Sequence, residues 1–320
     1  MKTWMAALAG ALLMFTAPMP TARAQSTIAK IVVPFAAGGG QDVLARVIAP
    51  ELGAQLGATF VVENRAGAGG ALGASDVARS KPDGSTLLMA ASSHTISAAL
   101  DRKAPFDPVN DFTAVAHVGT GAYIFLVNAK IPARSVAEFI AYAKTRSGKL
   151  NYASAGVGSA THLAMAYFAT RAQINVVHVP FKSTAEALNS LIGGDTEALI
   201  VPTLGSQAFV ANPAIRLLAV VSKQRIPTFR DVPTVDESGL PGFEFTSWFG
   251  LLGPAKMPAD VTQRLNDAVA RTIAIPRVAE SIAQQGIEPR PMSSAAFTEL
   301  LTDNYASMKR IVGAAGIAGD

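Results

Sequence analysis

The sequence lacks cysteine entirely among its 320 residues. Without thiols the chain forms no disulfide bond and supports no thiolate chemistry, so its stability in an oxidising compartment must come from noncovalent packing. Long apolar runs are also absent, because no segment after residue 24 holds the roughly 18 uninterrupted apolar residues that a membrane-spanning helix needs. The sequence therefore predicts a soluble protein once its first residues are removed.

Signature motifs of common enzyme classes are missing as well. The sequence has no G-x-S-x-G nucleophile elbow and no P-loop, and residues 67–72 (GAGGAL) fail the dinucleotide fingerprint at their sixth position. The four histidines, at positions 94, 117, 162 and 178, show no metal-binding spacing. We expect neither an enzyme nor a bound cofactor or metal, and a hydrolase of esters or amides of small acids is the least favoured alternative.

The first 24 residues have the features of a cleavable export signal. Lys2 precedes an apolar run over residues 5–15, and Ala22 and Ala24 place small residues at the two positions that a signal peptidase reads. We expect cleavage before Gln25 and a periplasmic mature chain. A retained anchor is the disfavoured alternative, because the apolar run is too short to cross a bilayer.

The net charge argues against nucleic acid as a partner. The leader carries Lys2 and Arg23 but no acid, so its removal leaves 25 basic against 23 acidic side chains, a formal charge of +2 rather than +4. A nucleic-acid-binding protein would be expected to show a clustered basic face.

Strand-like and helix-like patterns alternate along the chain, which predicts an α/β protein with mostly parallel sheets flanked by helices. Residues 31–33 form a buried strand pattern, and apolar residues then recur at helical spacing over residues 43–52. The 296 residues that follow the leader suffice for two lobes with separate cores. We expect residues 25–122 and 246–320 to form lobe 1 and residues 123–245 to form lobe 2, joined by two crossover strands.

One pattern occurs once in each lobe, namely a strand, a loop rich in glycine or serine, and a helix. It covers residues 31–42 (IVVPFAAGGGQD) and residues 151–162 (NYASAGVGSATH). Such loops lie beyond the carboxyl ends of parallel strands, where ligands bind, and the first amides of each helix attract anions. Two facing loops would suit a molecule with a carboxylate at each end. The alternative is that both loops are ordinary strand-to-helix turns.

Several single residues have two interpretations. Asp42 either orders pocket water or, as we favour, caps the helix that it begins. His94 follows a strand and is either a cleft residue or a polar surface residue. His162 is expected to orient a helix rather than act as a catalytic base. Phe35 is the aromatic residue that we expect most in the pocket, because it adjoins the first glycine loop.

These motifs resemble the tripartite tricarboxylate transporter substrate-receptor family, also called the Bug receptors, over essentially the whole mature length. The resemblance is carried by residues 33–42 (VPFAAGGGQD), 62–70 (VENRAGAGG), 82–88 (PDGSTLL), 152–163, 178–182 (HVPFK), 231–234 (DVPT) and 247–252 (SWFGLL). It implies a type II periplasmic binding fold whose two lobes close on a small carboxylate. It also implies delivery of that ligand to membrane permease subunits of a tripartite tricarboxylate-type transporter. A ligand-sensing subunit for a signalling partner is the alternative function.

The resemblance and the loop pattern together give a predicted set of ligand-binding residues. The set is Phe35, Ala36, Gly38, Gly39, Gln41, Asp42, Ser92, Ser93, His94, Ser154, Ala155, Gly158, Ser159, Thr161, His162, Phe181, Pro202 and Thr203.

The segment after the strand that ends at Val201 departs from the family pattern. Many relatives carry an acidic residue there, whereas this chain reads Pro202-Thr203-Leu204. A ligand ammonium would need a carboxylate partner to offset its desolvation. We therefore hypothesise that amino acids are poor ligands and that an uncharged or aromatic body, as in terephthalate, lies between the ligand carboxylates.

Overall fold

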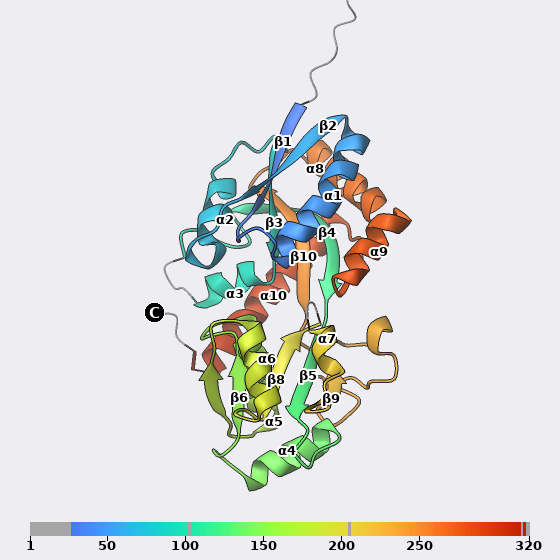
Figure 1. Ribbon diagram of the computed structural model, residues 1–320. Coiled ribbons are helices and arrows are strands. Elements are labelled where there is room, and N and C mark those ends of the chain that lie inside the picture. Colours follow the sequence, from blue (N-terminus) through green and yellow to red (C-terminus); the bar gives the residue numbers. More distant parts are fainter. Residues whose placement is uncertain (1–26, 101–103, 204–205, 315, 318–320) are drawn as a thin grey trace, which may run out of the picture.

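The computed structural model describes residues 27–100, 104–203, 206–314 and 316–317, and these residues form two units built on separate sheets (Figure 1). The first sheet has six strands in the order β11-β4-β10-β3-β1-β2, and the second has five in the order β7-β6-β8-β5-β9. The expected export signal lies outside the described residues. Within them, no helix combines the length and the apolar character that a bilayer crossing requires.

The first unit is formed by segments from both ends of the described chain. Its elements are β1 (Thr27–Val33), α1 (Gly40–Leu56), β2 (Ala58–Asn64), η1 (Ala68–Gly70), α2 (Ala71–Ala78), β3 (Thr86–Ala91), α3 (Ser93–Leu100), β4 (Phe112–Gly121), β10 (Ser247–Pro254), α8 (Ala259–Ile273), α9 (Pro276–Gln284), β11 (Ile287–Pro289) and α10 (Ser294–Ala314). Leu44, Ile48 and Leu52 of α1 lie on one helical face and are fully buried against the sheet. Burial of each such side chain stabilises the fold by about 2 kcal/mol.

The second unit is formed by one continuous stretch of chain. Its elements are β5 (Tyr123–Asn128), α4 (Val136–Thr145), β6 (Asn151–Ser154), α5 (Ala160–Ala172), β7 (Val177–Pro180), α6 (Thr184–Gly193), β8 (Ala198–Pro202), α7 (Gln207–Val210), β9 (Ile215–Val220) and η2 (Pro227–Phe229). Ser135 and Ser183 cap α4 and α6 by accepting a hydrogen bond from the amide three residues later. The predicted α/β class is confirmed.

Both sheets are mixed rather than mostly parallel. β1 pairs in parallel with β2 and β3, and β6 pairs in parallel with β7 and β8. By contrast, β10 runs antiparallel to β3 and β4, and β5 runs antiparallel to β8 and β9. The physical reason is that β5 and β10 each enter their sheet directly from the other unit. They therefore lack the helical crossover connection that a parallel pair of strands needs.

The chain passes between the units through extended segments. β4 ends at Gly121 in the first sheet, and β5 begins at Tyr123 in the second. The chain returns through residues 244–246 into β10. β4 itself was not identified from the sequence, where only its continuation over residues 122–128 had a clear extended pattern.

Candidate ligand-binding site

A cavity of about 220 Å³ lies between the two units. Its lining residues are Gly40, Gln41, Ala91, Ser92, Ser93, Gly121, Ala122, Tyr123, Ala160, Pro202, Thr203, Ser247, Phe249, Gly286 and Ile287. Gly40, Ser93 and Ala160 are the first residues of α1, α3 and α5. Three helix N-termini from two units therefore meet at one cavity.

The first amides of these helices supply donors for an anion. The earliest hydrogen bonds to the residue that precedes each helix are donated by Val43 to Gly39, by Ile96 to Ser92 and by Leu163 to Ser159. The amides at the start of each helix precede these donors and lack a backbone acceptor one helical turn back, and in α5 the amide of His162 is already taken by the Ser159 side chain. Together with the helix dipoles they place partial positive charge at the cavity, although no lysine or arginine is among the described residues that line it.

Hydroxyl groups form another part of the cavity wall. The Oγ atoms of Ser92 and Ser247 lie 2.6 Å apart, and the Tyr123 hydroxyl is hydrogen-bonded to Ser247. Burial raises the pKa of Tyr123 above its ordinary value, so its hydroxyl keeps its proton. Thr203 Oγ1 donates to the carbonyl oxygens of Ala122 at 3.1 Å and Gly286 at 3.2 Å, and so ties the end of β8 to the first unit.

The first glycine loop is braced by Asp42, which is almost completely buried. Its Oδ2 accepts from the Gly38 amide at 2.9 Å, its Oδ1 accepts from Asn64 Nδ2 at 2.9 Å, and Arg46 Nε donates to both oxygens. Asn64 Nδ2 also donates to the Phe35 carbonyl at 3.1 Å. The hydrogen bond from Arg46 is the main reason why the pKa of Asp42 falls to about 2.

The expectation that Asp42 caps α1 is wrong. The N-cap residue is Gly39, which makes no side-chain cap bond, and Asp42 instead holds the loop that precedes the helix. The Gly38 amide is therefore already engaged. Gly38 has a φ of +84°, in the left-handed region that favours glycine, and open space surrounds the position of its missing side chain. The left-handed turn of the backbone is thus the reason for glycine at this position.

The second loop is braced by its own side chains. Thr161 Oγ1 accepts from the Ala155 amide at 2.8 Å, and His162 Nδ1 accepts from the Gly158 amide at 3.0 Å. Ser159 is the N-cap of α5, because its Oγ accepts from the His162 amide at 3.2 Å. These bonds hold the loop so that Ala160 faces the cavity.

The predicted site residues fall into groups. Five of them line the interlobe cavity, namely Gln41, Ser92, Ser93, Pro202 and Thr203. Ala36, Gly38, Gly39 and Asp42 form the first loop and its brace, and Ser154, Ala155, Gly158, Ser159, Thr161 and His162 form the second. Phe181 packs against the apolar cluster of α6 and β8. Contact between any of these residues and a ligand stays a prediction.

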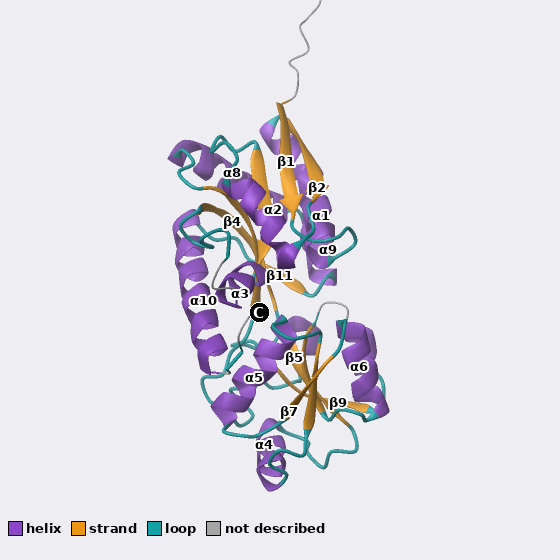
Figure 2. Ribbon diagram, turned by 90° about the vertical axis from the view of Figure 1, so that its left-hand side faces the viewer, coloured by secondary structure: helices purple, strands orange, loops and turns teal. Residues whose placement is uncertain are grey.

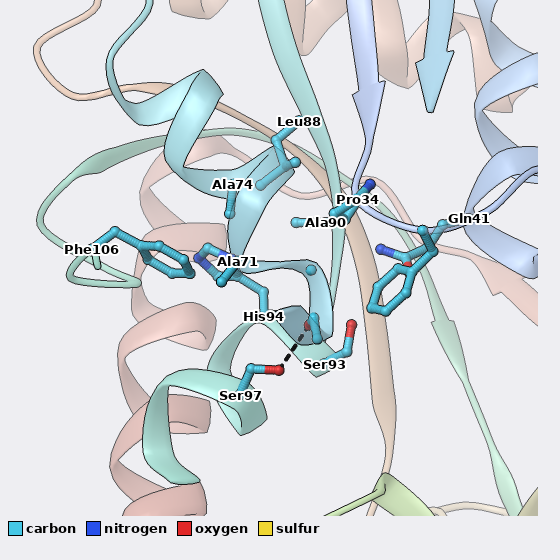
Figure 3. A pocket seen from close by; sticks show the side chains of 13 residues that line it. Pro34, Gln41, Ala71, Ala74, Leu88, Ala90, Ser93, His94, Ser97 and Phe106 are labelled. Atoms are coloured by element: carbon cyan, nitrogen blue, oxygen red, sulfur yellow. Dashed lines mark hydrogen bonds between the residues drawn. The ribbon is translucent and has the colours of Figure 1, made fainter. Parts of the chain in front are cut away.

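Phe35 and His94 line a different, very small cavity of about 10 Å³ within the first unit (Figure 3). That volume is roughly the space for one water molecule. The His94 ring stacks on Phe106 at 5.0 Å, and its Nε2 lies 3.0 Å from the Pro108 carbonyl oxygen. Burial lowers the pKa of His94 to about 4, so the ring is neutral and donates to that carbonyl. His94 is thus a packed interior residue, neither on the surface nor in the interlobe cavity.

Other lining residues were missed by the sequence analysis. Gly40 and Ala160 each follow a residue of the predicted site, Gly39 and Ser159, so the sequence did point to their neighbourhood. Ser247 begins the family motif at residues 247–252 on β10 but was not included in the predicted site. Tyr123 on β5 and Ile287 on β11 have no local motif that marks them as pocket residues.

Two histidines stack beneath the second loop. The rings of His162 and His178 are 3.8 Å apart and nearly parallel, and Ser154 Oγ lies 2.6 Å from His178 Nε2. Burial, and then the neighbouring His178, lowers the pKa of His162 to about 4, and burial lowers the pKa of His178. Tyr152 stacks on His178, and its own pKa is raised to about 12 by burial. Both imidazoles are therefore neutral at pH 7.

This stacked pair predicts that mild acid weakens the fold. In the unfolded chain histidine titrates near pH 6.5, whereas folded His162 titrates near 4, so the unfolded state binds more protons between these values. The free energy of unfolding should therefore decrease as the pH is lowered through this window. His162 alone should account for a decrease of about 1.5 kcal/mol between pH 7 and pH 5. Urea unfolding at both pH values measures the drop. His162→Asn, which keeps an acceptor for the Gly158 amide, should show a smaller drop, and an equal drop in both proteins would contradict the assignment.

Known proteins resemble this chain over most of its length. The sequence profile of the tripartite tricarboxylate transporter family receptor matches residues 44–317. The chain is 33% identical to Protein BugT of Bordetella pertussis over 262 residues, which are 81% of this chain and 80% of BugT. An R. palustris protein solved with adipate has a TM-score of 0.78 and 31% identity, covering 92% of this chain and 99% of its own. MatC of Rhodopseudomonas palustris, solved with bound malate, has a TM-score of 0.73 and 30% identity, covering 89% and 99%.

Proposed function

The chain belongs to the tripartite tricarboxylate transporter receptor family, whose members are periplasmic solute-binding proteins, and we propose that it captures a small dicarboxylate between its two units for delivery to membrane permease subunits. The observation that carries the proposal is the convergence of the N-termini of α1, α3 and α5 on one cavity. Backbone amides at helix N-termini bind carboxylates without a cationic side chain. N-termini from both units allow one carboxylate to be held on each side.

The lining favours a ligand without an amino group. No aspartate or glutamate is among the described residues that line the cavity, where Pro202 ends β8 and Thr203 follows it. A ligand ammonium enclosed there would lose its hydration without gaining a carboxylate partner. Ala91, Ala122, Ala160, Phe249 and Ile287 instead offer apolar contact to an uncharged body. This pattern supports aliphatic dicarboxylates such as adipate, which a structural relative was solved with, or an aromatic one such as terephthalate.

Calorimetry with matched acids tests this function. We expect adipate or terephthalate to bind in the micromolar range and aspartate and glutamate to bind at least about 100-fold more weakly, because about 3 kcal/mol of uncompensated desolvation corresponds to that factor. Adipate monoamide, which lacks one carboxylate, is the control and should also bind weakly. Tight binding of aspartate, or equal binding of adipate and its monoamide, would refute the proposal.

Closure of the cleft is part of the same proposal. We take residues 25–122 and 246–320 as one lobe and residues 123–245 as the other, and the lobes rotate about the two extended segments that join them. Export with removal of residues 1–24 places the receptor in the periplasm. The outward-facing surfaces of both lobes are then available to the permease when the ligand is enclosed.

A further inference from the structure

The C-terminal helix α10 connects the two lobes at a distance from the crossover strands. Near its start, Phe297 and Leu301 are buried in an apolar cluster of the first unit that includes Trp248. Near its end, Met308 and Ile311 are buried in the main apolar cluster of the second unit. Figure 2 shows α10 passing along one side of the molecule, from beside β4 toward the unit that contains α5. One helix is thus anchored in both cores.

Asn304 lies between these two anchors and joins the helix to the ligand site. Its Oδ1 accepts from Thr95 Oγ1 at 2.6 Å and from Trp248 Nε1 at 3.1 Å, and both donor residues are buried. Thr95 is in the first turn of α3, two residues after Ser93, which lines the cavity. Trp248 follows the cavity residue Ser247 on β10. A single side-chain oxygen therefore links α10 to a ligand-binding helix and to a crossover strand.

The returning crossover and α10 border a common groove and also share an apolar cluster. A groove of about 610 Å³ has Glu244, Phe245 and Thr246 on one side and α10 residues, among them Asn304 and Met308, on the other. Phe245 of this segment is buried in the same apolar cluster as Met308 and Ile311, so the crossover cannot move relative to the helix without disturbing that packing. A continuous helix does not stretch, so rotation of the lobes must change how one end of α10 packs.

The described conformation has the lobes in contact. Thr203 Oγ1 donates to the Gly286 carbonyl across the boundary. A methyl group on Gly158 of the second unit would meet Leu100 Cδ1 of the first at 2.8 Å. The packing of Met308 and Ile311 therefore belongs to an arrangement in which the lobes touch, and we expect weakening of that packing to favour an arrangement with the lobes further apart.

We propose that α10 is a third connection between the lobes, with Asn304 as a positioning residue, and that its packing sets the balance between open and closed receptor. The proposal rests on the proposed function in that it assumes closure over a carboxylate. The apparent Kd equals the intrinsic Kd divided by the fraction of receptor that is in the binding-competent state. Substitutions on α10 that change this fraction therefore change the affinity, although the helix does not line the cavity.

Substitution of Asn304 tests the link in the exported protein, where removal of residues 1–24 takes away Trp4 and leaves Trp248 as the remaining tryptophan. Asn304→Leu should weaken adipate binding about tenfold and shift the Trp248 emission of the ligand-free protein, because the indole N–H loses its acceptor. Asn304→Asp keeps the acceptor and should restore both. Thr302→Ala, at an exposed position of the same helix, is the matched control and should change neither.

Truncation of Ile311, which anchors the C-terminal end of α10 in the second unit, tests the balance between open and closed receptor. Ile311→Ala should increase the radius of gyration of the ligand-free protein in small-angle scattering and raise the adipate Kd about tenfold, and Ile311→Val serves the same purpose if the alanine variant melts near room temperature. Folded Asn304→Leu and Ile311 variants with the wild-type Kd and radius would overturn the proposal. If the wild type bound no dicarboxylate at all, the proposed function would fail, while the ligand-free scattering would still decide the role of α10.

Discussion

A carboxylate placed at position 160 should abolish ligand binding while leaving the fold intact. Ala160 is the first residue of α5 and lines the interlobe cavity. An acidic side chain is favourable at this end of a helix, so Ala160→Asp should melt no lower than the wild type. Its carboxylate would occupy the amides that we assign to the ligand and would repel a bound anion. At a distance near 4 Å that repulsion is about 4 kcal/mol, so adipate binding should weaken at least about 100-fold.

The matched control for this substitution is Ala185→Asp. Ala185 is exposed in the first turn of α6, a helix of the same unit that does not line the cavity. Ala185→Asp adds the same charge in the first turn of a helix that is remote from the cavity, so calorimetry should return the wild-type Kd. If Ala160→Asp bound adipate as well as Ala185→Asp does, the N-terminus of α5 would not be an anion site.

Removal of the Asp42 carboxylate should cost both stability and binding. Asp42→Ala leaves the Gly38 amide without its acceptor, removes one of the two acceptors of Asn64 Nδ2, and leaves Arg46 without its ion-pair partner. Arg46 is half-exposed and regains water, so the cost comes mainly from the loop donors left without this acceptor, about 2 kcal/mol. Because the loop also sets the position of the first α1 amides, we expect the adipate Kd to rise at least about tenfold. Urea unfolding and calorimetry measure the two effects.

The control for Asp42 is another paired acid of the same unit. Asp76 pairs with Arg65 and Arg79 near the surface, so Asp76→Ala should change the free energy of unfolding by less than about 1 kcal/mol and leave binding unchanged. The pH range in which stability is lost also distinguishes Asp42 from the histidines. Its pKa is lowered to about 2, so its contribution is complete above the unfolded value and is lost only as pH falls toward 2. Equal effects of the two substitutions would contradict the bracing role.

The local pattern of the sequence was sufficient to place the loops at the site. A short apolar strand, glycine or serine, and then helical spacing are consecutive in the chain, and this order alone locates the loops within residues 31–42 and 151–162. The same logic brought Gln41, Ser92 and Thr203 into the predicted set, and all three line the cavity. Residues near strand ends are recognisable because strand and helix periods differ.

The hydrogen-bond partners within those loops were not predictable in the same way. Two loop amides already have acceptors, because Asp42 accepts from Gly38 and His162 accepts from Gly158. A sequence shows that donors exist, whereas the side chain that reaches each donor depends on the fold. His94 illustrates the same limit, since its neighbours Phe106 and Phe112 come from a later loop and strand.

The sequence by itself determined the α/β class, the absence of thiol chemistry, the family and the two glycine-containing loops, because each of these depends on residues that are adjacent in the chain or on composition. Only the tertiary structure decided that three helices from two units point at one cavity, that Tyr123, Ser247 and Ile287 complete its wall, and that α10 is anchored in both cores. These features join segments that lie far apart in the chain. Their contacts arise from the packing of the two sheets and of the helix that connects the two units. The periodicity of the local sequence does not reveal such contacts.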